Sequence, residues 1–463
     1  MISSSTSTFV KPNNKPIEEK RILVIGSGPA GLSALCAFAE AEGDDGGATT
    51  PQISCYERQA DVGGQWNYTW RTGLDANGEP VHSGMYSQLW SNGPKECIEF
   101  ANYTFLQHFK KNIGSYPPRQ VLYDYIVGRA KHFGLYDKIK FETSVRRVTF
   151  DDETQEFTVV SQDLKTKEES IEQFDHVICC AGHFHVPNVP DFPGLETFPG
   201  HVLHSHDVRS FEEWKDKRIL VIGTSYSAED MAVQSYKFGC RDITISFRTA
   251  PMPFDWPNGI ETRPLLEKVD GRVATFSDES TKEVDVIILC TGYQHTFPFM
   301  EQKLQLKTTN RLWIDNCYKG IFWNDNPRLV YIGMQDQWLS LTMFDAQAWY
   351  ARDVILGRIE IPKDRQSDMD SWSSREATLK GDEANIRYQM DYTAELVEAT
   401  DYPSWDFELT VQTFIDWEHA KHKDIFGYRN TAHKSVFTSS VAPVPRLPWK
   451  ENKDDSSKTF LEN

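Results

Sequence analysis

Two glycine-rich turns carry the residues of this sequence that are best suited to chemistry. The first, Gly26-Ser27-Gly28-Pro29-Ala30-Gly31, follows the apolar run 21–25 and precedes a stretch rich in Ala and Leu. A Gly-x-Gly-x-x-Gly turn between a strand and a helix lets the backbone approach a pyrophosphate, and the N–H groups and dipole of the helix attract that anion. The next strand, 53–57, ends in Glu57, whose carboxylate can bind ribose hydroxyls. We therefore expect a dinucleotide here, against the alternative of a purely structural turn.

The second turn, 223–228, has a related pattern with a different ending. Gly223 is kept, while Ser225 and Ala228 stand at the other two glycine positions. The following strand, 242–247, leads into Arg248 and Thr249 instead of an acidic residue. An arginine and a hydroxyl would bind a 2′-phosphate that a carboxylate would repel, so the sequence favours NADPH over NADH. The alternative is that Arg248 only solvates the end of a strand.

A further glycine pair, Gly63-Gly64, is followed by Gln65 and Trp66. Amide and indole groups beside such a turn could lie against the ribityl chain and ring of a flavin. The same residues could equally form a surface turn with a partly buried tryptophan.

Two related segments, 175–182 and 285–292, predict how the chain is divided. Each begins with Asp, continues through a buried strand and ends in Gly, and proline-containing stretches at 186–193 and 296–299 follow them. We interpret the fold as α/β, with two Rossmann-like dinucleotide-binding domains, the NADPH domain inserted into the FAD domain. The predicted bounds are a disordered lead-in at 1–19, the FAD domain at 20–187 and 296–463 (the latter with C-terminal helices), and the NADPH domain at 188–295.

Composition excludes several classes of partner. The 463 residues include 49 basic and 67 acidic side chains, a net charge of -18, which disfavours nucleic acids and anionic membranes. No apolar run approaches the ~20 residues of a membrane helix. The eight cysteines form no Cys-x-x-Cys motif, so we expect buried thiols and a cytoplasmic protein. We expect no metal at the histidines of the linker and strand segments, which have no paired carboxylate motif beside them: His183, His185, His201, His204 and His206.

The order of these motifs resembles that of the flavin-containing monooxygenases, which oxygenate nitrogen and sulfur. Between the two turns lies Phe198-x-Gly200-x-x-x-His204-x-x-x-Val208. The family signature ends in Phe or Tyr where this chain has Val208, and its Baeyer-Villiger relatives end in Trp. The segments 64–75, 89–96, 333–338 and 343–353 resemble the subgroup that acts on trimethylamine, and the similarity runs from about residue 20 to about residue 450.

The resemblance implies site residues at matching positions. FAD contacts are expected on the first turn and at Glu57, Gln59, Gln65, Trp66, His82, Val145 (through its backbone) and Gln337. NADPH contacts are expected at Trp90, Asn92, Tyr226, Ser227, Arg248 and Thr249. The residues expected to act on the reaction are Asn92, near the flavin and nicotinamide, and three near the amine, Tyr226, Asp336 and Trp417.

The resemblance also implies a reaction that needs no protein nucleophile. NADPH reduces FAD, and the reduced flavin takes up dioxygen as a C(4a)-hydroperoxide that oxygenates a small tertiary amine, with trimethylamine N-oxide as the expected product. Asn92 and retained NADP would keep the site dry. Leu339, Leu341 and Thr342 depart from the usual residues beside Asp336 and bear on substrate preference. The alternatives are a broader sulfide or indole oxygenase and an uncoupled NADPH oxidase or redox flavoprotein; a homodimer is compatible with all of them.

Overall fold

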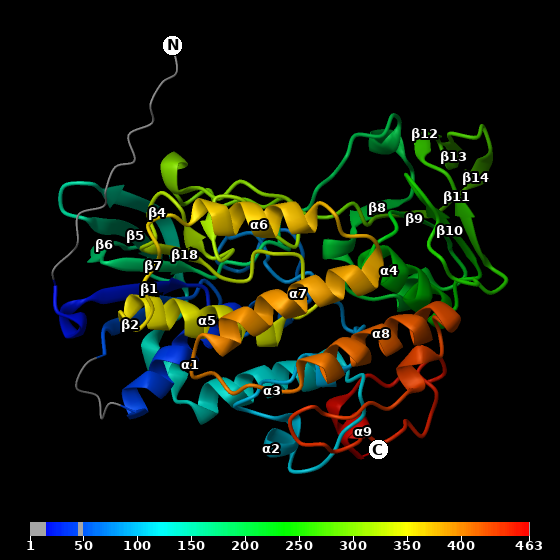
Figure 1. The fold of residues 1–463 in the computed structure, drawn as a ribbon. Coiled ribbons are helices and arrows are strands. Elements are labelled where there is room, and N and C mark those ends of the chain that lie inside the picture. Colours follow the sequence, from blue (N-terminus) through cyan, green and yellow to red (C-terminus); the bar gives the residue numbers. More distant parts are fainter. Residues whose placement is uncertain (1–14, 45–49, 463) are drawn as a thin grey trace. The chain divides into compact units, whose positions relative to one another are not determined.

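The computed structural model describes residues 15–44 and 50–462 (Figure 1). The predicted lead-in at 1–14 lies outside the described residues. Residues 15–19 differ from that prediction: Ile17–Glu19 forms a 3₁₀ turn, and Lys15 Nζ lies 2.5 Å from a Glu156 carboxylate oxygen and 3.0 Å from one of Asp175. These ion pairs attach the segment to strands far along the chain, which the sequence pattern could not indicate.

The chain folds into two compact units that interleave along the sequence. The first unit comprises Met1–Gly64, Arg129–Gly182 and His295–Ser404, and the second comprises Gln65–Gly128, His183–Gln294 and Trp405–Asn463. The segments 65–128 and 405–463, predicted to belong to the FAD domain, thus fold with the predicted NADPH domain. Polar contacts explain this difference, since the Gln234 side-chain amide donates to the Gln88 carbonyl at 3.1 Å and the Tyr226 hydroxyl donates to Glu418.

The first unit is built on a mainly parallel sheet. Its strands are β1 (Arg21–Ile25), β2 (Gln52–Tyr56), β3 (Ile139–Lys140), β7 (His176–Cys179), β16 (Cys317–Tyr318), β17 (Phe322–Trp323) and β18 (Leu329–Tyr331). They lie in the order β16-β17-β18-β7-β1-β2-β3, with all pairs parallel except those of β17. An antiparallel sheet of β4 (Thr143–Asp151), β5 (Glu156–Asp163) and β6 (Glu169–Phe174) packs on it through a shared apolar core.

Helices cover the sheet of the first unit. These are α1 (Pro29–Asp44), α5 (Leu341–Ile355), α6 (Gln366–Glu376) and α7 (Gly381–Glu398). Helix α5 packs between α1 and α7 (Figure 1). α5 is almost wholly buried, which follows from its composition, Leu341 to Ile355 being apolar on most of its surface.

The second unit contains a five-stranded parallel sheet. Its strands are β8 (His201–His204), β9 (Arg218–Ile222), β10 (Asp242–Ser246), β11 (Ile260–Arg263) and β15 (Val286–Leu289), in the order β11-β10-β9-β15-β8. The second unit also has an antiparallel sheet, formed by β12 (Leu266–Asp270), β13 (Val273–Phe276) and β14 (Thr281–Glu283). Its helices are α2 (Phe105–Phe109), α4 (Tyr226–Lys237), α8 (Phe407–Lys423) and α9 (Ser457–Glu462), while α3 (Arg119–His132) continues across the boundary into the first unit.

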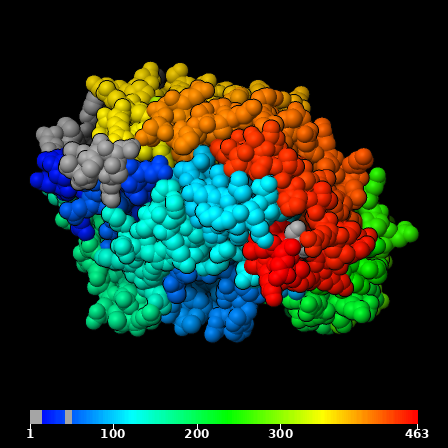
Figure 2. Space-filling view, turned by 90° about the horizontal axis from the view of Figure 1, so that it is seen from below, coloured from blue at the N-terminus to red at the C-terminus, as the bar shows by residue number. Residues whose placement is uncertain are grey.

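The end of the chain is part of the second unit. Lys111 Nζ donates to the Leu461 carbonyl, and the Phe460 ring meets Trp90 edge-on at 5.7 Å between centroids. In Figure 2 the red C-terminal residues accordingly lie against the cyan residues of this unit.

Within the described residues, no helix is both long enough and apolar enough to span a membrane. All eight cysteines are buried thiols, as expected.

The two parallel sheets repeat one arrangement, which confirms the predicted internal similarity. In the first, Asp175 precedes β7 and its carboxylate accepts the Arg21 N–H of β1 at 2.8 Å. In the second, Asp285 precedes β15 and accepts the Arg218 N–H of β9 at 3.1 Å. The carboxylate satisfies the first backbone donor of the neighbouring central strand, so both aspartates fix the same register. This confirms the predicted α/β class with two dinucleotide-binding folds.

Candidate functional site

The first glycine turn joins β1 to α1 and has the close contacts that such a turn requires. A Cβ atom on Gly31 would lie 1.9 Å from the Gly26 carbonyl oxygen, and one on Gly64 would lie 2.9 Å from the Gly28 Cα. Gly26 has φ +94°, a conformation that favours glycine. Pro29 begins α1, where the absent N–H is not needed by the helix. Bare backbone therefore lines this turn, and it fits the pyrophosphate of FAD.

Glu57 lies directly after β2 with its carboxylate buried against that turn. Oε2 accepts the Ser27 N–H at 2.6 Å and the Ser27 hydroxyl at 2.9 Å, and Oε1 accepts the Gln59 N–H at 2.7 Å. Burial raises the pKa of Glu57, and the hydrogen bonds from Gln59 and Ser27 oppose the rise. A carboxylate offers about four acceptor positions. The three bonds to protein leave about one acceptor position that a ribose hydroxyl could use.

Two further predicted FAD contacts lie in the first unit, Gln59 on the adenosine side and Val145 through its backbone. Gln59 Nε2 donates to the Gly64 carbonyl at 3.2 Å, so it fixes the backbone of the glycine pair Gly63-Gly64. Val145 stands where the register of β4 against β5 shifts before Arg147. A β-bulge takes backbone groups out of the ladder, which fits the predicted backbone contact.

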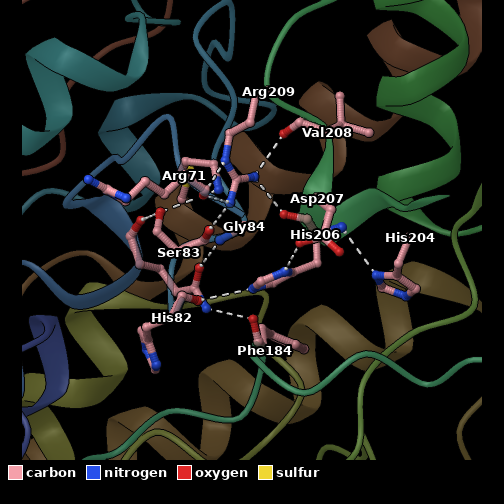
Figure 3. Close-up of polar contacts among 12 residues, drawn as sticks. Arg71, His82, Ser83, Gly84, Phe184, His204, His206, Asp207, Val208 and Arg209 are labelled. Carbon is pink, nitrogen blue, oxygen red and sulfur yellow. Dashed lines mark hydrogen bonds and ion pairs between the residues drawn. The ribbon is translucent and has the colours of Figure 1, made fainter. Parts of the chain in front are cut away.

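Gln65, Trp66 and His82, the remaining predicted FAD contacts apart from Gln337, lie in the second unit. The Gln65 amide bonds to two backbone groups: Nε2 donates to the Phe184 carbonyl at 2.5 Å, and Oε1 accepts the Gly84 N–H at 2.8 Å. His82 stacks on His185 with centroids 4.8 Å apart, and Trp66 is half-buried. Figure 3 shows the polar contacts around residues 82–84.

The second turn joins β9 to α4 and presents exposed residues. Gly223 has φ +129°, and a Cβ there would lie 2.3 Å from the Cys290 carbonyl oxygen. Ser225 is exposed and its side chain does not cap α4, while Ser227 lies in the first helical turn. Arg248 and Thr249 follow β10 and are exposed. The turn, the helix end and Arg248 are thus open to an anionic nucleotide.

Trp90 and Asn92 occupy very different surroundings in the second unit. Trp90 is buried, with its indole N–H donating to Asp455. Asn92 is exposed, and the residue before it is anchored because Arg429 Nε donates to the Ser91 carbonyl at 3.1 Å. The structure therefore presents the exposed Asn92 amide next to an anchored backbone position, whereas the Trp90 side chain is buried.

Tyr226 and Trp417, both predicted to lie near the amine, form a stacked pair. Their ring centroids are 6.3 Å apart with an interplanar angle of 19°. Lys421 Nζ lies 4.4 Å from the Tyr226 ring centroid and 4.8 Å from that of Trp417. The Tyr226 hydroxyl donates to Glu418 Oε1 at 3.1 Å, and a Cβ on Gly93 would touch Trp417 at 3.8 Å. The second unit thus gathers both aromatic residues beside the segment of Asn92.

Asp336 and Gln337 lie in the first unit, on the segment that leads to α5. Asp336 is half-buried, and its Oδ1 accepts the Gln337 N–H at 3.0 Å. Gln337 Nε2 donates to the Gly333 carbonyl at 3.2 Å. Leu339, Leu341 and Thr342, the residues that depart from the related pattern, are all buried.

Several residues that hold this machinery were missed by sequence reasoning. Lys421 and Glu418 support the aromatic pair, and Lys421 Nζ also lies 3.4 Å from Glu229. Burial raises the pKa of Glu229, and Lys421 opposes the rise. Gln389 bonds to the backbone around Asp336. Of these, only the i,i+3 spacing of Glu418 and Lys421 is visible in the sequence, and it is equally typical of a solvated helix face.

Two strand–turn–helix units of this kind, one of them with a carboxylate directly after its second strand, are typical of flavoprotein oxidoreductases that bind two dinucleotides. The family model described as flavin-binding monooxygenase-like matches residues 19–252 and 258–431, and the chain belongs to this family. It is accordingly a monooxygenase that depends on FAD and NADPH.

Individual relatives are similar over nearly the whole chain. The trimethylamine monooxygenases of Roseovarius sp. and Methylocella silvestris are 52% and 51% identical, covering 96% and 95% of this chain and 100% and 98% of their own. The crystal structure of Tmm from Pelagibacter sp. superposes with a TM-score of 0.92 at 47% identity, covering 95% of this chain and 100% of that one. S-allyl-L-cysteine S-oxygenase from Allium sativum superposes with a TM-score of 0.76 at 25% identity, over 90% and 96%.

Proposed function

We propose that this chain uses NADPH, FAD and dioxygen to convert trimethylamine to trimethylamine N-oxide. One observation carries the proposal: proteins named trimethylamine monooxygenase match 95–96% of this chain at 51–52% identity. The family model, which matches residues 19–252 and 258–431, includes both nucleotide turns as well as the segments that carry Asn92, Asp336 and Trp417.

The protein's own residues divide the work of holding the two cofactors. The turn 26–31, with Glu57, would hold FAD, and the turn 223–228, with Arg248, would hold NADPH. When bound, the flavin takes electrons from NADPH and supplies the oxygenating chemistry with dioxygen. Electrophilic oxygen transfer needs the nitrogen lone pair, so the amine must be unprotonated when it reacts.

The candidate reaction residues have roles that follow from their surroundings. The exposed Asn92 amide can donate hydrogen bonds from a backbone that Arg429 anchors. The Tyr226 and Trp417 rings offer aromatic surface suited to methyl groups. Asp336 can orient a small amine through its carboxylate. Each of these roles belongs to the proposal.

The test is a steady-state substrate panel with the purified holoenzyme. NADPH consumption and product are measured with trimethylamine, a methylated sulfide and indole at equal concentrations. We expect one trimethylamine N-oxide for each NADPH consumed and a higher kcat/KM for trimethylamine than for the other two compounds. A preference for sulfide or indole would refute the amine assignment, and NADPH consumption that yields only hydrogen peroxide would indicate an uncoupled oxidase.

We also propose that the enzyme works in a reducing compartment, the cytoplasm. The support is the set of eight buried thiols. Alkylation of the denatured protein, isolated without reductant, should modify all eight cysteines. Disulfides in that sample would contradict the assignment. A homodimer stays a prediction that light scattering can test.

A further inference from the structure

Arg209 follows the last position of the signature segment 198–208, and its guanidinium donates to several backbone carbonyls. Nε and Nη2 donate to the Arg71 carbonyl at 3.1 and 2.9 Å, and Nη2 also donates to the Ser83 carbonyl at 3.0 Å. Nη1 donates to the carbonyls of His206 and Val208 at 2.7 and 2.9 Å. As Figure 3 shows, one side chain thereby joins three backbone segments.

The arrangement uses the shape of the guanidinium. Burial lowers the pKa of Arg209, and the nearby Asp207 carboxylate opposes that effect. Five N–H donors in a rigid planar fork can serve several carbonyls at once, which a lysine ammonium with three donors cannot. The cation is therefore placed to fix backbone geometry.

The backbone that it fixes carries two predicted flavin contacts. Ser83, whose carbonyl Arg209 holds, follows His82, and its hydroxyl donates to the Gln65 carbonyl at 2.6 Å. The Gln65 side chain in turn accepts the Gly84 N–H at 2.8 Å. Arg209 on one side and Gln65 on the other thus hold residues 82–84.

The signature segment is tied to the same place. The His206 N–H donates to His204 Nδ1 at 3.1 Å, and His206 Nε2 lies 3.4 Å from the His82 carbonyl oxygen. Val208 is fully buried, so the carbonyl that it presents to Arg209 has a fixed position. The segment 204–208 and the loop 82–84 are therefore coupled by the Arg209 guanidinium and by the contact of His206 with the His82 carbonyl.

We propose that Arg209 is a positioning residue that sets the geometry of Gln65 and His82 for the flavin. This inference rests on the proposed function only in requiring bound FAD. It makes the planar fork, rather than the positive charge alone, the essential property of residue 209.

The test compares holoenzyme variants by FAD release, followed as the rise of flavin fluorescence after dilution, and by the visible absorption of bound flavin. We expect Arg209→Met to release FAD ~10-fold faster or more, because several charge-assisted hydrogen bonds are lost. Its flavin absorption bands should shift as well. Arg209→Lys should fall between this variant and the unmodified enzyme.

Arg241→Met is the matched control. Arg241 Nη1 also donates to two backbone carbonyls, those of Tyr236 at 2.5 Å and Cys240 at 2.9 Å, in the same unit. Arg241→Met should leave the rate of FAD release and the absorption spectrum of the bound flavin unchanged. Equal acceleration in the control, or release from Arg209→Met at the unmodified rate, would overturn the proposal.

If Arg209→Met does not fold, Arg209→Lys decides. Faster FAD release and a shifted flavin absorption spectrum in Arg209→Lys support a role for the planar guanidinium. FAD release and absorption like those of the unmodified enzyme refute that role. Amine turnover plays no part in these readouts. A failure to oxygenate trimethylamine would therefore reject the proposed substrate without touching this inference, and an unchanged flavin environment would reject the inference alone.

Discussion

Gln389, a buried residue of α7, should control the position of Asp336. Its Oε1 accepts the N–H groups of Trp338 and Leu339, both at 2.7 Å, and its Nε2 donates to the Asp336 carbonyl at 2.5 Å. One side chain thus satisfies three backbone groups of the segment that carries Asp336 and Gln337. Gln389→Leu removes all three bonds, whereas Gln389→Glu keeps an acceptor for the two N–H groups and loses the donor.

The size of the effect follows from the number of groups left unsatisfied. Each buried donor or acceptor without a partner costs about 1–3 kcal/mol. Gln389→Leu leaves three such groups, so a segment that stayed in place would lose about 3–9 kcal/mol. The cheaper outcome is for the segment to move toward water, which displaces Asp336. We therefore expect only about 2–3 kcal/mol of lost stability together with a ~10-fold higher KM for the amine.

The assay separates displacement from general damage. Steady-state kinetics with trimethylamine and urea unfolding are measured on Gln389→Leu, Gln389→Glu and the control Tyr388→Phe. Tyr388 is the buried neighbour on the same helix, and its hydroxyl donates to the Trp372 carbonyl at 3.0 Å. The control should lose stability while keeping the KM for the amine.

A double-mutant cycle with Asp336→Asn completes the test. If Gln389 acts through Asp336, its effect on KM should largely disappear when Asp336 is already changed. An unchanged KM in Gln389→Leu, or effects of the two substitutions that simply add, would refute the reasoning even if stability fell as expected.

Three further predictions address the second unit. Arg248→Ala should raise the KM for NADPH about 10–100-fold, because a charge-assisted contact with the 2′-phosphate is lost, and should leave the KM for NADH nearly unchanged. A similar rise in the KM values for NADPH and NADH would contradict the phosphate assignment. Asn92→Ala should increase hydrogen peroxide formed per NADPH while the rate of flavin reduction stays the same, and unaltered coupling in stopped-flow and peroxide assays would remove its role. Burial lowers the pKa of His204 to about 4, although the hydrogen bond to the Gly292 carbonyl opposes this, so the folded state favours the neutral ring. The contribution of neutral His204 to the free energy of unfolding is present above the unfolded pKa near 6.5 and is lost as pH falls toward 4, by about 3 kcal/mol at most. Urea unfolding at pH 7 and pH 4.5 should therefore show a smaller loss of stability on acidification in His204→Gln than in the unmodified enzyme.

The sequence predicted what depends on local pattern. Each glycine turn is a continuous strand, turn and helix, so β1 with α1 and β9 with α4 could be recognised from neighbouring residues. Asp175 and Asp285 were visible as a repeat because each stands directly before its strand. These elements needed no knowledge of distant contacts.

Supports made by distant residues could not be predicted in the same way. Gln389 lies 50 residues or more from the backbone that it holds, and Arg209 bonds a carbonyl 138 residues away. Gln and Arg are mostly surface residues, so neither type signals burial on its own. The placement of 405–463 likewise depends on pairs such as Trp90 with Asp455.

The matching registers of the two sheets sharpen the basis for nucleotide choice. Gly26 N–H donates to the Tyr56 carbonyl at 2.9 Å, and Gly223 N–H donates to the Ser246 carbonyl at 3.0 Å, so Glu57 and Phe247 occupy equivalent positions. The next residue is then an arginine in both units, Arg58 and Arg248. Because both sites have the arginine, it cannot alone distinguish a 2′-phosphate from a ribose hydroxyl. The second unit has Phe247 where the first has the carboxylate of Glu57, so the repulsion that would exclude a 2′-phosphate is absent there. Arg248 can bind the phosphate because no carboxylate stands beside it at that position.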